Sequence, residues 1–224
     1  MGENIYIARP KLGAGIYTVP DISQILNLNQ AKARRWLHNY WNSRMNLSET
    51  SYTWGNGRDL GMDFLMLIEF YVFYKLREIG ISSQKIITAH NTIANYINSP
   101  FPFAKTKIFF DKEIFFCTDN LKTIIKADET KQIAFNKIIL EYVKKIDFDQ
   151  SNDPLRFWPL GKNNNIVVDP HHQFGRPVIK GTNIKIDILY DLFKAGESKK
   201  FIANLYNIDV KSVSDSINYF LRVA

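Results

Sequence analysis

Basic side chains concentrate in one stretch of this sequence, which has no acidic residue between Asp21 and Glu49. The cations of this stretch are Lys32, Arg34, Arg35 and Arg44. Such cations neutralise the phosphates of nucleic acid, which supplies a large share of the affinity for a duplex. Polar side chains among them can hydrogen-bond to base edges in the grooves, and the candidates are Gln30, His38 and Asn39. The stretch therefore predicts binding to double-stranded DNA.

Two helices separated by a short turn would position these side chains. Pro20 and Asp21 suit the first turn of one helix, which continues with the apolar residues Ile22, Ile25 and Leu26. A second helix is predicted from Gln30, with an apolar face made of Ala33, Trp36, Leu37 and Tyr40. Its other face carries Lys32, Arg35 and Asn39, flanked by Arg34 and His38. A helix-turn-helix reads DNA with its second helix, which here is the basic one; the alternative is a solvated basic face.

A turn signal, Gly55-Asn56-Gly57, follows and predicts a β-hairpin. If this hairpin were a wing beside a minor groove, Arg58 would point at the DNA backbone; the alternative is an exposed turn arginine. The next patterns predict a long apolar helix from about Met62 to Ile79 and a serine-capped helix over residues 82–97.

This order of elements resembles the winged helix-turn-helix of the MerR type over about residues 15–98. Arg35 and Trp36 match the Arg-aromatic pair that ends its helix-turn-helix. Gly80-Ile81-Ser82 matches the Gly-hydrophobic-Ser step before its last helix. The resemblance implies that this part of the chain binds DNA.

Composition limits the class of protein. The net charge of +7 and the pI near 9.3 favour a polyanionic partner. The single cysteine, Cys117, is expected to pack as a small hydrophobe in a reducing compartment. The N-terminus lacks the pattern of a signal peptide, and Tyr6 stands where a myristoylation motif has Ser or Thr. The most apolar segment, residues 64–74, is too short to cross a bilayer. We therefore expect a cytoplasmic protein with no membrane partner.

The middle of the chain is expected to connect two domains. Two short strands are predicted over residues 105–117, a third over 121–126 and a helix over 131–146. Alternating polar residues then imitate a calcium loop, namely Asp147, Asp149, Ser151 and Asp153. Asn152 stands where such a loop needs glycine, and Trp158 stands where it needs glutamate. We interpret this segment as a solvated linker without a metal.

Residues 174–186 are rich in glycine and basic residues but do not form a phosphate-binding P-loop. Lys180 precedes Gly181 instead of following it, the spacing from Gly175 is one residue too long, and Pro177 removes a backbone donor. The adjacent His171 and His172 would point to opposite faces of an extended segment and have no third ligand nearby. We expect neither a metal nor a cofactor here.

Three short helices are predicted after this loop. The first ends at Gly196 and is expected to turn inward Ile188, Leu189, Leu192 and Phe193. The second is capped by Ser198. The third is capped by Asp209 and is expected to turn inward Val213, Ile217, Phe220 and Leu221.

This C-terminal stretch is similar to a small helical family recognised in VapB-like antitoxins of toxin–antitoxin pairs. The shared motifs are Val168-Asp169-Pro170, Phe174-Gly175-Arg176-Pro177, Gly181-Thr182, Ala195-Gly196-Glu197-Ser198 and Asn218-Tyr219. The family usually has arginine after Gly-Thr, where this chain has Asn183. Larger members also share an N-terminal helix-turn-helix, a helix like residues 63–78, and steps like Pro102-Phe103-Ala104 and Trp158-Pro159. The resemblance implies a DNA-binding antitoxin that neutralises a PIN-like ribonuclease toxin and represses its own operon.

Toxin contacts are expected in the C-terminal module. Its third helix has only Lys211 and Arg222 against Asp215, so the module is expected to read DNA poorly. The aromatic candidates for an interface with the toxin, or with a second copy of the chain, are Phe201, Tyr206 and Tyr219. Alternatively, these aromatics complete a small core and the toxin contacts residues 108–146.

The sequence therefore predicts a mainly α protein with small β-hairpins. It would comprise a winged helix-turn-helix region over residues 1–98, an α/β connecting region over 99–160 and a three-helix, helix-turn-helix-like domain over 161–224. Expected partners are double-stranded operator DNA, a PIN-like ribonuclease toxin and a second copy, in a homodimer or higher toxin–antitoxin complex. Alternatives are a MerR-like transcription regulator without a toxin, or a protein-interaction adaptor. A nuclease is less favoured, because the sequence shows no carboxylate cluster and no nucleophile beside a base.

Overall fold

The computed structural model describes residues 7–45, 50–111, 113–117, 124–127, 133–134 and 144–222. Its α-helices are α1 (Val19–Leu26), α2 (Gln30–Trp36), α3 (Phe64–Glu78), α4 (Ser83–Ile97), α5 (Pro102–Lys105), α6 (Ile186–Lys194), α7 (Lys199–Tyr206) and α8 (Val210–Leu221). The strands are β1 (Tyr17–Thr18), β2 (Gly61–Met62), β3 (Lys107–Asp111), β4 (Glu113–Cys117), β5 (Ile124–Lys126), β6 (Ile133–Ala134), β7 (Ile146–Phe148), β8 (Pro154–Phe157), β9 (Ile166–Val167) and β10 (Val178–Ile179). The predicted mixture of helices with small antiparallel strand pairs is confirmed.

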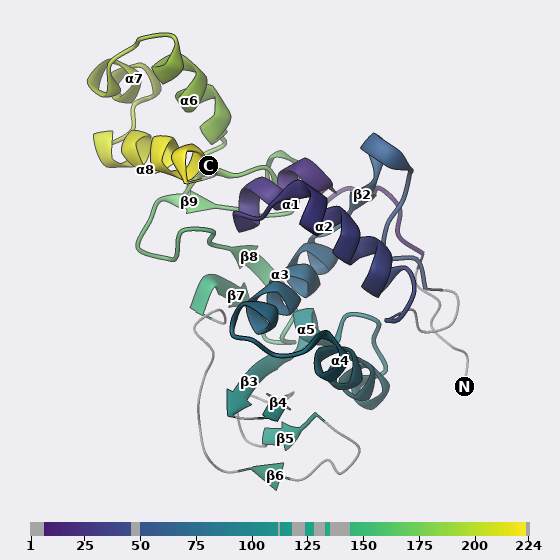
Figure 1. Cartoon of the computed structure of the whole chain (residues 1–224). Coiled ribbons are helices and arrows are strands. Elements are labelled where there is room, and N and C mark those ends of the chain that lie inside the picture. The colour runs from purple at the N-terminus through teal and green to yellow at the C-terminus, as the bar shows by residue number, and fades with distance from the viewer. Residues whose placement is uncertain are drawn as a thin grey trace.

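Helices α6, α7 and α8 form a lobe of their own at one end of the molecule, while α1 to α5 gather in a larger lobe (Figure 1). The four-stranded sheet, in the order β3-β4-β5-β6, lies at the opposite end of the larger lobe (Figure 1). One hydrophobic core runs through the larger lobe and a second joins α6, α7 and α8. Among the described residues, no helix has both the length and the apolar character needed to cross a bilayer.

The predicted helix, turn and helix near the N-terminus are present. Thr18 and Asp21 form a capping box at the start of α1, which ends at Asn27 with a left-handed φ of 54°. Asn29 caps α2 by accepting a hydrogen bond from Lys32 N–H. The helix continues as a π-helical turn, η1 (Leu37–Trp41). These caps explain why the chain stops and restarts a helix within residues 27–29.

Helix α3 is the central element of the larger lobe and is buried along most of its length. It begins at Phe64, later than the predicted Met62, because the Asp63 side chain accepts from Met66 N–H and caps it. Two tryptophans of the preceding helix pack on it: Trp41 stacks on Phe70, and Trp36 meets Phe73 edge-on. The apolar face predicted for the second helix is therefore directed at α3.

The chain reverses at the predicted turn, but through a longer loop. Trp54 and Gly61 exchange two backbone hydrogen bonds of 3.0 and 2.9 Å. Between them lies a 3₁₀ turn, η2 (Gly57–Asp59), that places Arg58 at the surface. β2 begins at Gly61 and pairs with β1, so this loop is tied to the strand that leads into α1.

The middle region corrects two predictions. A helix was predicted over residues 131–146, but strands occupy both ends of this segment. Near its start, Ile133 of β6 pairs with Ile125 of β5, and at its end Ile146 begins β7. Residues 135–143 lie outside the described residues. Isoleucine suits a strand as well as a helix, and here a neighbouring strand supplies the backbone partners. The strands predicted over residues 105–117 and 121–126 are confirmed as β3, β4 and β5.

The segment interpreted as a linker is instead a hairpin of β7 and β8. Its turn is closed by Asp149, whose Oδ1 accepts the N–H groups of Ser151 and Asp153, each at 2.8 Å. Asp147 accepts a hydrogen bond from Trp158 Nε1 at 2.8 Å and pairs with Lys162 at 2.6 Å. These carboxylates hold the turn, and within the described ranges no three His, Cys, Asp or Glu side chains are grouped to hold a metal.

The C-terminal helices begin at the predicted caps, Ser198 for α7 and Asp209 for α8. The predicted inward faces are partly wrong, since 37% of Ile188, 36% of Phe193 and 60% of Leu221 is exposed. Three short helices cover only a narrow stripe of one another, so the first and last residues of the expected stripes stay outside. The core of this lobe is made by Ile179, Ile186, Leu189, Ile202, Ala203, Val213, Ile217 and Tyr219, with Ile166.

Candidate nucleic-acid interface and the seam beside it

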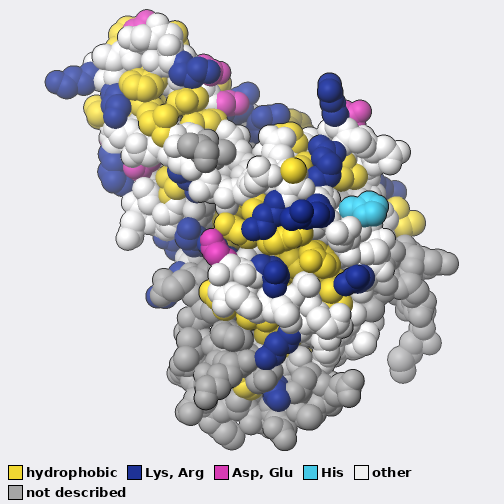
Figure 2. All heavy atoms as spheres, in the orientation of Figure 1, with side chains coloured by type: hydrophobic (Ala, Val, Ile, Leu, Met, Phe, Trp, Pro, Cys, Tyr) yellow, Lys and Arg dark blue, Asp and Glu magenta, His cyan; other side chains and the backbone are white. Residues whose placement is uncertain are grey.

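The outer side of α2 and η1 carries most of the predicted DNA contacts. Lys and Arg side chains spread over α2 and beside η2 (Figure 2). The exposed members of the predicted set are Gln30, Arg34, Arg35, His38, Asn39, Arg44 and Arg58. The structure therefore brings cations and potential base-reading groups to one face, while the apolar side of the helix is buried.

Lys32 differs from the other cations. Its Nζ lies 4.7 Å from the centroid of the Trp36 ring and 5.8 Å from that of Tyr74 on α3. A cation over two aromatic faces is attracted to both rings. Lys32 is half-buried in this position, so part of its role is to hold α2 against α3.

Arg34 links α2 to the loop before β2. Its Nη1 donates a hydrogen bond of 2.7 Å to the carbonyl oxygen of Gly57. This bond sets the position of the loop, and with it Arg58, relative to α2. Arg35 has no hydrogen-bond or ion-pair partner among the described residues, so its guanidinium is available to a ligand.

His38 and Asn39 lie in the π-helical turn η1, which the sequence pattern did not indicate. Nδ1 of His38 is 3.2 Å from Oδ1 of Asn39, and the Asn39 carbonyl accepts a hydrogen bond from Ser43 Oγ. A π turn contains one more residue per hydrogen-bonded ring than an α turn, so it changes where the side chains point. The two polar side chains are thereby presented together at the C-terminal end of the basic face.

Helix α8 exposes a less basic face than α2. Val213 and Ile217 point into the small core, and Ser212 and Asp215 are buried beneath Asn165. The N–H of Asn165 donates to Asp215 Oδ2 at 3.2 Å and its Nδ2 donates to Ser212 Oγ at 2.9 Å. The exposed side of the helix carries Lys211, Asn218 and Leu221, and Lys211 pairs with Asp215 at 3.5 Å. The single cation on this exposed side therefore already has a partner within the chain.

The three aromatic candidates for toxin contact have different environments. Phe201 is 49% exposed and Tyr206 is half-buried. Tyr219 is fully buried and takes the alternative, core role: it packs into the core of α6, α7 and α8, and the guanidinium of Arg222 lies 4.3 Å from the centre of its ring. Sequence reasoning missed Leu205, which is 56% exposed and follows Phe201 by one helical turn.

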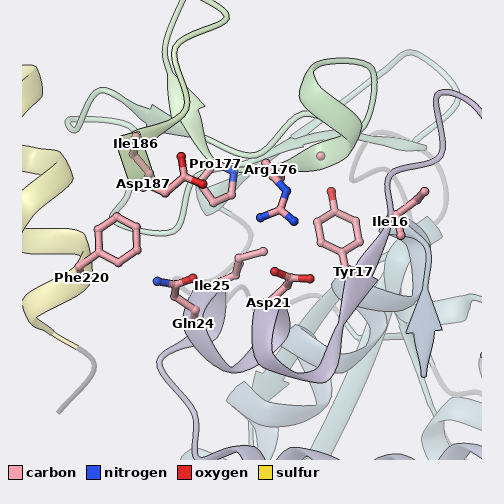
Figure 3. Close-up of a pocket in the computed structure, with 11 residues that line it drawn as sticks. Ile16, Tyr17, Asp21, Gln24, Ile25, Arg176, Pro177, Ile186, Asp187 and Phe220 are labelled. Atoms are coloured by element: carbon pink, nitrogen blue, oxygen red, sulfur yellow. The ribbon is translucent and has the colours of Figure 1, made fainter. Parts of the chain in front are cut away.

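A seam joins the C-terminal lobe to β1 and α1. The N–H of Ile16 donates to the carbonyl of Phe174 at 2.9 Å. Gly175 has a φ of +83°, and a Cβ at this position would lie 2.1 Å from the Tyr17 hydroxyl oxygen. The seam encloses a pocket, into which the Arg176 guanidinium extends toward Asp21 (Figure 3). The Phe-Gly-Arg-Pro loop is therefore a docking element between the lobes.

Known proteins are similar to this chain over its C-terminal part or over most of its length. Residues 166–220, which hold β9, β10 and the three C-terminal helices, match the sequence family described as "Protein of unknown function (DUF433)". The chain is also similar to "Putative antitoxin VapB45" of Mycobacterium tuberculosis (strain ATCC 25618 / H37Rv), at 20% identity over 91% of this chain and 92% of that relative. The crystal structure of Rv2018 from Mycobacterium tuberculosis has the same fold, with a TM-score of 0.66 and 16% identity over 93% of this chain and 99% of that one. The two sequence similarities support a toxin–antitoxin-like protein.

Proposed function

We propose that this chain is a non-enzymatic, cytoplasmic antitoxin that represses its own operon and neutralises a PIN-like ribonuclease toxin. The observation that carries the proposal is the exposed basic face of α2 and η1 in a chain similar, over 91% of its length, to a protein named as an antitoxin. In this proposal the two activities belong to different lobes.

Helix α2 enters the major groove in this proposal, and the chain acts there as a winged helix-turn-helix. Arg35 and Arg44 neutralise phosphates, while Gln30, His38 and Asn39 reach base edges near the start and end of the face. The loop over residues 55–60 is the wing, held beside α2 by the bond from Arg34 to Gly57. Arg58 at its tip then contacts the DNA backbone.

The C-terminal lobe is the part that contacts the toxin. The exposed side of its α8 carries one cation, Lys211, which is paired with Asp215, so this helix is poorly suited to bind DNA. Phe201 and Leu205 instead expose apolar surface on one side of α7. Apolar and aromatic side chains at a surface favour a protein interface over a nucleic-acid interface.

Helix-turn-helix proteins bind palindromic operators as dimers, because the two-fold symmetry of the dimer matches that of the operator. We therefore propose that this chain binds its operator as a homodimer.

A gel-shift experiment with the full chain tests the DNA-binding part. The probe is the DNA upstream of its own gene, compared with an unrelated duplex at two salt concentrations, because phosphate contacts weaken as salt rises. Arg35→Ala should lower affinity for the upstream DNA, whereas Lys194→Ala on α6, an equal loss of charge at an exposed site, should not. Equal binding to both duplexes by all three proteins would reject operator recognition by α2.

Co-purification tests the toxin-binding part. The product of the adjoining reading frame is tagged, produced with the full chain and assayed for ribonuclease activity before and after the complex is separated. We expect a stable complex that shows no ribonuclease activity until the antitoxin chain is removed. DNA binding without any such complex would favour the MerR-like regulator that has no toxin, and neither activity would favour the adaptor.

A further inference from the structure

A second cavity, of about 420 Å³, opens between the β7–β8 hairpin and the β9–β10 pair. Its apolar lining is a small buried cluster of its own, made by Trp158, Val167 and Val178. The rest of the lining is polar and comes from Arg156, Asp169, His172, Lys180 and the loop over residues 181–183. The volume falls within the range of small-molecule sites, which combine an apolar wall with a few placed polar groups.

A nearly buried carboxylate organises the polar side of this cavity. Asp169 is 7% exposed, and its Oδ2 lies 3.1 Å from Arg156 Nε and 3.2 Å from His172 Nδ1. Its other oxygen accepts the N–H of His171 at 2.9 Å. The carboxylate thus fixes a guanidinium and an imidazole while using only one nitrogen of each, and the remaining nitrogens have no partner in the described part of the chain.

Further donors come from the loop that follows β10. Lys180 Nζ lies 5.5 Å from the centroid of the Trp158 ring, so the ammonium stands at the cavity wall. The backbone N–H groups of Gly181 and Asn183 donate to no described acceptor. Asp169 is the single acid among the lining residues, against the cations Arg156 and Lys180, so the site is positive even with His172 neutral.

We propose that this cavity binds a phosphate group. Donors approach it from β8, from the turn after β9 and from the loop after β10. Three directions of approach suit a tetrahedral group with several acceptor oxygens better than a planar carboxylate with two. The site is not a P-loop, because its two cations are far apart in the sequence. Arg156 is held at the cavity by Asp169, and Lys180 is held there by the Trp158 ring. The phosphate belongs either to a free phosphorylated ligand or to the backbone of bound DNA, and the inference does not depend on the antitoxin function.

Calorimetric titration of the full chain with pyrophosphate, without DNA or toxin, tests the site. Lys180→Gln should weaken pyrophosphate binding about tenfold, and Asn183→Asp, which places a negative charge at the rim, should abolish it. Both residues are exposed, so neither substitution is expected to unfold the chain. The matched controls, Lys194→Gln on α6 and Asn204→Asp on α7, should bind pyrophosphate as the parent does. The inference is overturned if the parent does not bind pyrophosphate, or if the cavity variants bind it as tightly as their controls.

A titration with duplex DNA identifies the source of the phosphate. If Lys180→Gln also lowers duplex affinity and reduces the salt slope by about one, the site holds a DNA phosphate. If Lys180→Gln leaves duplex binding unchanged while it weakens pyrophosphate binding, the ligand is a free phosphorylated molecule. Both results support a phosphate site, and both remain interpretable if operator binding by α2 proves wrong.

Discussion

Arg222, at the end of α8, donates a hydrogen bond of 2.9 Å to the carbonyl oxygen of Ile25, near the end of α1. The same Nη2 also donates to the carbonyl of Gln24 at 3.1 Å. Carbonyls in the last turn of a helix have no partner within the helix, and a cation there also meets the negative end of the helix dipole. One side chain of the C-terminal lobe therefore caps α1, the first helix of the larger lobe.

Arg222→Gln should loosen the seam between the lobes. Hydrogen bonds to a charged group contribute roughly 1.5–3 kcal/mol each, so we expect a loss of about 2 kcal/mol from the free energy of unfolding. Urea unfolding measures the loss, and limited proteolysis should show faster cleavage between the lobes. Arg44→Gln, an exposed arginine on the same lobe as α1, is the control; equal stability of the two variants would contradict the capping role.

Gly175→Ala should destabilise the fold more than Gly181→Ala. Both glycines have a positive φ, +83° and +74°, so alanine costs about 1–2 kcal/mol of backbone strain at either position. Only at Gly175 would the new Cβ also overlap the Tyr17 hydroxyl, and overpacking of this kind adds about 1–3 kcal/mol. Midpoints of urea unfolding compare the two variants. Indistinguishable midpoints would show that the contact with Tyr17 does not constrain the loop.

Glu69 should make stability fall as pH rises. Burial raises the pKa of this carboxyl above its usual 4.5, although His90 and the N–H of Ala104 act in the opposite direction. The folded chain therefore holds the proton more tightly than the unfolded chain, so the free energy of unfolding decreases from about pH 4.5 upward until Glu69 is ionised in both states.

Glu69→Gln should remove this decrease, since the amide does not titrate yet can still accept the hydrogen bond from Ala104. Denaturant unfolding at several pH values measures the difference between parent and variant. Glu78→Gln is a control with the opposite pH dependence. Burial raises the pKa of Glu78 in part, but hydrogen bonds from Lys75 and Tyr74 lower it overall. The contribution of Glu78 to the free energy of unfolding is therefore lost as pH falls. Parallel stability curves for parent and Glu69→Gln would contradict the assignment.

Arg34 and Arg35 should affect DNA binding by different routes. The double change to alanine is expected to weaken operator binding by roughly 2–4 kcal/mol, at about 1–2 kcal/mol for each contact. Arg34→Ala alone should also free the loop over residues 55–60, because it removes the bond to Gly57. Amide exchange in that loop should therefore rise in Arg34→Ala and stay unchanged in Arg35→Ala, and the reverse pattern would refute the tether.

Phe201→Asp should abolish toxin capture without unfolding the chain, because nearly half of this side chain is already exposed. Tyr219→Ala should instead cost roughly 3–5 kcal/mol of stability, as expected for an emptied aromatic position in a core. Co-purification with the tagged toxin, together with thermal unfolding, separates the two effects. Leu12→Asp is the control, since Leu12 is 86% exposed away from the C-terminal helices. Toxin capture that survives Phe201→Asp would move the interface off α7.

The sequence by itself determined the local elements. Asn29, Ser198 and Asp209 mark helix starts because a capping side chain bonds to a backbone N–H only three residues away. The sequence also predicted the apolar side of the second helix, because its apolar residues, Ala33, Trp36, Leu37 and Tyr40, recur at the helical period. The alternating acids before Trp158 were interpreted as a linker, and the hairpin that they form was missed.

The tertiary structure alone decided which side chains are available. Lys32 and Arg35 look alike in the sequence, yet Lys32 is held by Tyr74 from another helix while Arg35 is open. Tyr219 is buried because Arg222 and the small core enclose it. Asp169 brings together Arg156 of β8 and His172 of the turn after β9. Each of these environments includes atoms on another element, namely Tyr74 of α3, the core residues of α6 and α7, and Arg156 of β8. Only the folded chain fixes the distances to these atoms, on which burial, charge and hydrogen bonding depend.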